Sequence, residues 1–180
     1  MSHPATQPEI ISALESNARS IAEHFASIPD PRLFDGDPDH WSPAHHLAHL
    51  TDVAASVGRA LRAGALPLHP AARSRTYAEV RDAAAMSLAA TSKARLLEMG
   101  RKVVIAPERT RQDLIEAFEG ASAELRAAAA AWSDGALDRH ALRHPLIGEM
   151  TVREMLFFVV VHERHHLKRV RTREESSSDA

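Results

Sequence analysis

The residues best suited to chemistry form one short stretch near the end of the chain, His162-Glu163-Arg164-His165-His166. In a helix, His162 and His166 lie one turn apart on one face, because residues four positions apart stack. Two imidazoles at that spacing can bind one metal ion. The stretch also fits H-E-x-x-H, the signature of zinc proteases, so two kinds of metal site have to be distinguished.

The protease interpretation requires a third ligand that the sequence does not supply. The extended form of the motif has glycine at position 169 and histidine at position 172, where this chain has Arg169 and Thr172. No sheet that could bind an extended peptide is predicted either. We therefore interpret the stretch as H-x-x-x-H, which supplies two metal ligands. The third ligand must come from elsewhere in the chain.

The chain has 12 histidines, and a second cluster of them can supply that third ligand. The two clusters are His45, His46 and His49, and His162, His165 and His166. On a helical wheel His46 lies near the middle of the apolar face of its helix, His49 lies at the edge and His45 points further out. Periodicity alone leaves both His46 and His49 open as the inward ligand.

Apolar periodicity and caps predict helices that would position both clusters. The predicted ranges are 9–27, 43–63, 76–99, 109–132 and 151–171. Ser42 followed by Pro43 is a strong helix start, and Thr151 with Glu154 three positions later is a capping box. Residues 30–40 and 136–150 are predicted as loop, and no strand is predicted.

These elements predict an all-α protein, a four-helix bundle with an accessory helix or crossover segment between its second and third main helices. We expect a single domain over residues 1–171 and a disordered tail over residues 172–180, which are rich in serine and charge. A length of 180 residues suits one domain of this kind.

The last predicted helix places His162 and His166 on a line with Val159 and Val170, which indicates that both imidazoles face the core. Burying an unsatisfied imidazole costs about 1–3 kcal/mol per unpaired group. A shared metal ion would remove that cost, and so would a fully hydrogen-bonded pair. Both alternatives stay open at this point.

Composition excludes several other classes of function. The chain has no cysteine, which excludes disulfides, thiolate metal sites and a cysteine nucleophile. Its net charge of −2 implies no general attraction to nucleic acid or to anionic membranes. The longest apolar run, residues 155–161, is far too short to span a bilayer, and the N-terminus does not read as a signal peptide. We therefore expect a cytoplasmic protein with neither a nucleic-acid nor a membrane partner.

Two blocks together resemble a known family, the DinB/YfiT-like superfamily. Residues 41–50 fit its W-S-x-x-x-x-x-x-H-L pattern, and residues 144–151 and 162–167 fit its H-P-x-x-G-x-x-T and H-x-x-H-H-L patterns. The resemblance implies a four-helix bundle, often dimeric, with a metal ion held by His49, His162 and His166. It thus favours His49 over His46. Arg169 departs from the glutamine of many members and places a cation near the site.

The resemblance implies a divalent-metal-dependent enzyme, a hydrolase or a thiol S-transferase acting on a small molecule. Zinc or nickel is the expected ion, a low-molecular-weight thiol is a candidate second cofactor, and a homodimer is expected. Glu163 is a candidate base, with a solvated or salt-bridged glutamate as the alternative. Arg169 is a candidate contact to an anionic substrate or cofactor, and His144 is expected to fix its loop by a hydrogen bond.

A non-catalytic metal-binding bundle, with a structural or stress-related role, is the main alternative to an enzyme. Its ion would be closed off by a fourth protein ligand, for which His46 and Glu163 are the candidates. A partner in DNA damage is suggested only by the family's name, and the balanced charge gives it little support.

Overall fold

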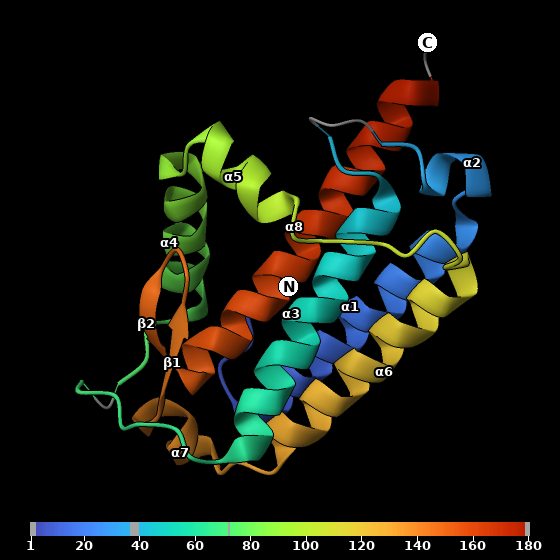
Figure 1. Cartoon of the computed structure of the whole chain (residues 1–180). Helices are drawn as coiled ribbons and strands as arrows, with labels where there is room; N and C mark the ends of the chain where they lie inside the picture. Colours follow the sequence, from blue (N-terminus) through green and yellow to red (C-terminus); the bar gives the residue numbers. More distant parts are fainter. Residues whose placement is uncertain (1–2, 37–39, 72, 179–180) are drawn as a thin grey trace.

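Four long helices carry the fold of this computed structural model, which describes residues 3–36, 40–71 and 73–178 (Figure 1). They are α1 (Gln7–Ser27), α3 (Pro43–Ala63), α6 (Arg111–Ala130) and α8 (Val152–Ser178). Helices α1 and α3 each pack against both α6 and α8, so the four helices form a ring that encloses the buried apolar residues. The predicted all-α four-helix bundle is confirmed.

The helix starts follow the predicted caps. The Ser42 hydroxyl accepts a hydrogen bond from the His45 amide at the start of α3, and Gly64 ends that helix with a left-handed φ of 69°. Thr151 and Glu154 form the predicted capping box at α8, with amide-to-side-chain distances of 3.2 and 3.1 Å.

The predicted helix over 76–99 is wrong in one respect, because it is two helices. Helix α4 (Tyr77–Ala90) ends at Thr91, whose backbone is extended, and α5 (Lys93–Gly100) begins with Ser92 as its cap. The Ser92 hydroxyl accepts from the Arg95 amide, which satisfies a donor that a continuous helix would have paired with backbone. Helix α4 packs on α8, and α5 leads from the upper end of α4 back toward the bundle (Figure 1).

The loop predicted over 136–150 is also wrong in part. It contains the end of α7 (Asp134–Arg139) and an antiparallel hairpin of β1 (Ala141–His144) and β2 (Gly148–Thr151). Gly148 has a φ of 90°, which suits the turn between the strands. Strands of four residues carry too little alternation to be predicted, and the hairpin is stabilised by its contacts with α8. The predicted loop over 30–40 likewise contains a short helix, α2 (Asp30–Leu33).

Residues 172–180 were expected to form a disordered tail, whereas helix α8 continues to Ser178, and residues 179–180 lie outside the described part of the chain. The added turns have partners in the bundle. Arg173 Nη1 donates to the Trp41 carbonyl at 2.8 Å, and the Glu174 carboxylate lies 2.9 Å from His24 Nε2. These long-range contacts stabilise helix that composition alone did not predict.

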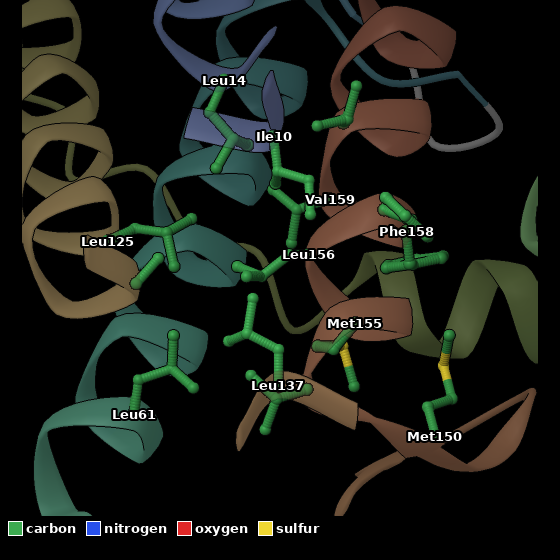
Figure 2. Packing of buried hydrophobic residues seen from close by; sticks show 14 of the residues in the cluster. Ile10, Leu14, Leu61, Leu125, Leu137, Met150, Met155, Leu156, Phe158 and Val159 are labelled. Carbon is green, nitrogen blue, oxygen red and sulfur yellow. The ribbon is translucent and has the colours of Figure 1, made fainter. Parts of the chain in front are cut away.

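The buried apolar residues form two clusters along the bundle. Figure 2 shows the first, where Ile10, Leu61 and Leu156 come from three different helices. The second lies nearer the C-terminal end of α8 and includes Phe25, Phe118 and Leu167. Along α8, His162 and His166 fall between the residues of the first cluster and those of the second.

Among the described residues, none of the helices combines the length and the apolar character that a membrane span requires.

Candidate metal centre

Three imidazoles from two helices meet between α3 and α8. His162 Nε2 lies 3.2 Å from His49 Nε2 and 3.0 Å from His166 Nε2. All three ligand atoms lie within 4.8 Å of one another. His162 and His166 come together because they are one turn apart on α8, and His49 reaches them from α3. This His49–His162–His166 group is called the histidine cluster below.

The donor set of the histidine cluster fits a divalent metal ion. Two nitrogens bound to one tetrahedral zinc ion at about 2.05 Å lie about 3.3 Å apart, close to the two separations seen here. Without an ion, His162 Nε2 faces two other ring nitrogens at hydrogen-bond distance and can share a proton with only one of them. His162 Nδ1 is buried and has no hydrogen-bond partner among the described residues.

Burial keeps these imidazoles in the form that binds metal. His166 is 8% exposed, and His49 and His162 are half-buried. Burial lowers the pKa of His162 and His166 well below the ordinary histidine value, with smaller contributions from the neighbouring histidines. It lowers the pKa of His49 as well. A neutral imidazole has a free lone pair for an ion, so no proton must first be displaced.

Two aromatic side chains hold the rings from outside. The Trp41 ring lies 5.2 Å from His49 and 6.1 Å from His166, and Phe158 stacks on His162 at 5.1 Å. Trp41 in turn packs on Gly100 at the end of α5, where an added Cβ would lie 2.7 Å from the indole nitrogen. Helix α5 is thereby joined to the wall of the site.

The two other histidines of α3 have different surroundings. His46 Nδ1 lies 2.6 Å from His166 Nδ1, whereas the other ring nitrogen of His166, Nε2, lies near His162. Burial is the largest of the effects that lower the pKa of His46 to about 3. His45 Nδ1 lies 2.7 Å from the Ser42 hydroxyl, outside the cluster. Periodicity left His46 and His49 open, and the structure places only His49 with its Nε2 in the cluster.

Glu163 follows His162 in sequence but points to a different part of the bundle. Its carboxylate accepts a hydrogen bond of 3.0 Å from Asn17 Nδ2 on α1. The side chain is 1% exposed, and Glu163 Oε1 has no hydrogen-bond partner in the described chain. Burial raises the pKa of Glu163 to about 8. Sequence reasoning missed Asn17, whose signal is a polar residue inside the apolar line Ile10–Leu14–Ile21.

The remaining candidates lie around the histidine cluster. Arg169 is exposed, and its charge contributes to lowering the pKa of both His46 and His165. His165 packs beside His166 with ring centres 5.5 Å apart and is not a member of the cluster. His144 Nδ1 accepts from the Leu146 and Ile147 amides at 3.2 and 3.1 Å, as predicted for a loop-fixing histidine.

The fold and the site together define a helical bundle whose histidine cluster could hold a metal ion. Comparison with protein families agrees with this class, since the family model of the DinB superfamily matches residues 13–170. The chain therefore belongs to the DinB superfamily. No curated protein and no solved structure matches it.

Proposed function

We propose that this protein is a divalent-metal-dependent enzyme in which His49, His162 and His166 hold the ion. The observation that carries the proposal is the convergence of three Nε2 atoms without a fourth ligating side chain among the described residues. Three protein ligands and an open position are the pattern of catalytic zinc sites, whereas structural sites are closed by four. The two side chains that could close the site are engaged elsewhere, His46 with His166 and Glu163 with Asn17.

A bound zinc or nickel ion would act as a Lewis acid that generates a nucleophile from water or a thiol near neutral pH. The chain's own residues orient and shield that site. Trp41 and Phe158 pack against the rings of His49 and His162. We propose that Arg169, which is exposed and whose charge acts on His46, attracts an anionic substrate or a low-molecular-weight thiol with a carboxylate. Glu163 takes no part in this scheme, because its carboxylate faces α1.

Two reaction types fit such a site, hydrolysis of a small molecule and transfer of a thiol. Assays with hydrolase substrates, and thiol-dependent transfer assays with several low-molecular-weight thiols, would distinguish these two reactions. Activity should disappear with a chelator, return with zinc or nickel, and be lost in His49→Ala. His45→Ala is the matched control, because His45 is on the same helix and bonds to Ser42 instead. Activity that survives both the chelator and His49→Ala would refute the proposal.

A non-catalytic metal-binding bundle is the second candidate, and the burial of His166 at 8% exposure favours it. In that case the ion would stabilise the fold or an interface between copies of the chain. The two candidates differ in whether a small molecule reaches the ion. Cobalt-substituted protein should change its visible spectrum on addition of a small anion if the position is open, and should not change if the site is closed. We also propose a homodimer, which sedimentation equilibrium would test.

A further inference from the structure

His46 lies outside the histidine cluster, but one of its ring nitrogens makes a close contact with a cluster residue. His46 Nδ1 and His166 Nδ1 are 2.6 Å apart, shorter than either separation within the histidine cluster. Two ring nitrogens at that distance share one proton, since two lone pairs would repel and two N–H groups would clash. One of the two histidines must therefore donate to the other.

The direction of this bond follows from the role of His166 in the proposed function, on which the inference rests. If His166 Nε2 binds the ion, that nitrogen carries no proton, and the ring of a neutral His166 carries its proton on Nδ1. His166 Nδ1–H then donates to His46 Nδ1, which accepts through its lone pair. The opposite direction would place the proton of His166 on Nε2, where it would block the ion.

We propose that His46 is a positioning residue that fixes His166 in its metal-binding tautomer. A ligating histidine almost always donates its other ring N–H to an acceptor, which sets the ring orientation and raises its basicity. Helix α3 thus supplies both a ligand, His49, and the acceptor one turn before it. His162 has no comparable support, since its Nδ1 is buried without a hydrogen-bond partner among the described residues.

The packing around His46 makes the contact specific. The Trp41 and His46 rings form a T-shaped pair with ring centres 5.2 Å apart, and the same indole stacks on His166 at 6.1 Å. Both imidazoles are therefore held by one aromatic side chain. Leu47 beside His46 is buried in the second apolar cluster, which anchors this turn of α3.

The test compares two substitutions of His46 in the full chain. His46→Leu keeps most of the volume and removes the acceptor, whereas His46→Asn keeps an amide oxygen near the position of Nδ1. Zinc affinity is measured by competition with a chromophoric chelator. We expect His46→Leu to lose about 10- to 100-fold in zinc affinity, and His46→Asn to remain within about threefold of wild type because an acceptor is retained.

A spectroscopic measurement on wild type covers the case in which His46→Leu does not fold. Long-range ¹H–¹⁵N correlation of the zinc-loaded protein reports which ring nitrogens carry protons. We expect a protonated His166 Nδ1 and an unprotonated His46 Nδ1. A protonated His46 Nδ1, or a fourth imidazole bound to zinc, would overturn the inference, and so would wild-type affinity in His46→Leu. If wild type itself binds no metal, the proposed function fails first.

Discussion

Helix α8 has two buried polar faces that differ in how far the protein satisfies them. On the face toward α3, three imidazoles converge on one point, with Nε2 atoms 3.0 and 3.2 Å apart. On the face toward α1, Glu163 finds one partner in Asn17, and Asn17 Oδ1 in turn accepts from Arg164 Nε at 3.0 Å. On the first face, potential metal-ligand atoms lie close together. On the second face, a series of hydrogen bonds connects α8 with α1.

Sequence neighbours in H-E-x-x-H thus need not share a site. His162 and Glu163 are consecutive, but a helix turns by about 100° per residue, so they face different partner helices. The sequence motif therefore groups His162 with Glu163, whereas in the folded bundle their side chains contact different helices. Each prediction below changes one face and asks whether the other responds.

On the face toward α3, a large effect is expected from stabilisation of the fold by metal. Because an ion that binds only the folded state stabilises it by mass action, zinc at 100 times its Kd should raise the free energy of unfolding by about 2.7 kcal/mol. Urea titration with and without zinc measures the effect. His49→Ala should show no stabilisation, while His165→Ala, a change beside the cluster but outside it, should behave as wild type. Equal stabilisation of all three proteins would contradict the assignment of the ligands.

The next effect concerns the face toward α1. Asn17→Ala removes the hydrogen bond to Glu163 and leaves a buried carboxyl without that partner, so we expect a loss of about 1–3 kcal/mol in unfolding free energy. Zinc affinity should stay unchanged. Ser16→Ala, at an exposed neighbouring position, is the control and should be near neutral. A clear loss of zinc affinity in Asn17→Ala would show that the two faces are coupled.

The pH dependence of stability should also separate the faces. The folded Glu163 keeps its proton up to a pKa of about 8, whereas its ordinary value is 4.5. Between these values Glu163 binds fewer protons in the unfolded chain than in the folded one, so its contribution to stability falls as pH rises from 4.5 to 8, by at most about 1.4 kcal/mol per pH unit. The buried histidines, whose pKa values are lowered, act in the opposite direction below pH 6.5, so the effect of Glu163 is measured as the difference in stability between metal-free Glu163→Gln and metal-free wild type. This difference should shift in favour of Glu163→Gln as pH rises. The idea fails if the two proteins change in stability in parallel over this range.

The smallest expected effect comes from Arg169. Its exposed charge opposes a cation at the histidine cluster, so Arg169→Ala should raise zinc affinity by about two- to threefold at low ionic strength. The difference should vanish in about 1 M salt, where screening is complete within a few ångströms. Lys168→Ala, which removes a second exposed charge on the same helix, is the matched comparison. An effect of Arg169→Ala that is independent of salt would rule out this electrostatic explanation.

Local signals predicted most of the fold. The long helices follow from apolar periodicity, and their starts at Ser42 and Thr151 follow from caps, which depend only on residues within one turn. The break at Thr91 and the hairpin after His140 were missed, because short elements are decided by what they pack against. The last turns of α8 were missed for the same reason, since Arg173 pairs with Trp41 far away in sequence.

For the candidate site, the sequence predicted the ligands that depend on residue spacing but not the contacts between helices. The four-residue interval identified His162 and His166, but choosing His49 over His46 needed the family resemblance. The bond between His46 and His166 depends on how two helices approach each other and on ring orientation, which no periodicity encodes. The separation of Glu163 from the cluster likewise depends on α1 and on Asn17.

If the two faces of α8 have different roles, only changes on the face toward α3 should alter the metal content of the protein. Wild type, His162→Ala and Glu163→Gln are purified side by side without chelator, reconstituted with zinc and analysed for bound metal. We predict one ion per chain in wild type and in Glu163→Gln, and none in His162→Ala. Metal-free wild type after reconstitution, or equal loss of metal in both variants, would contradict the account.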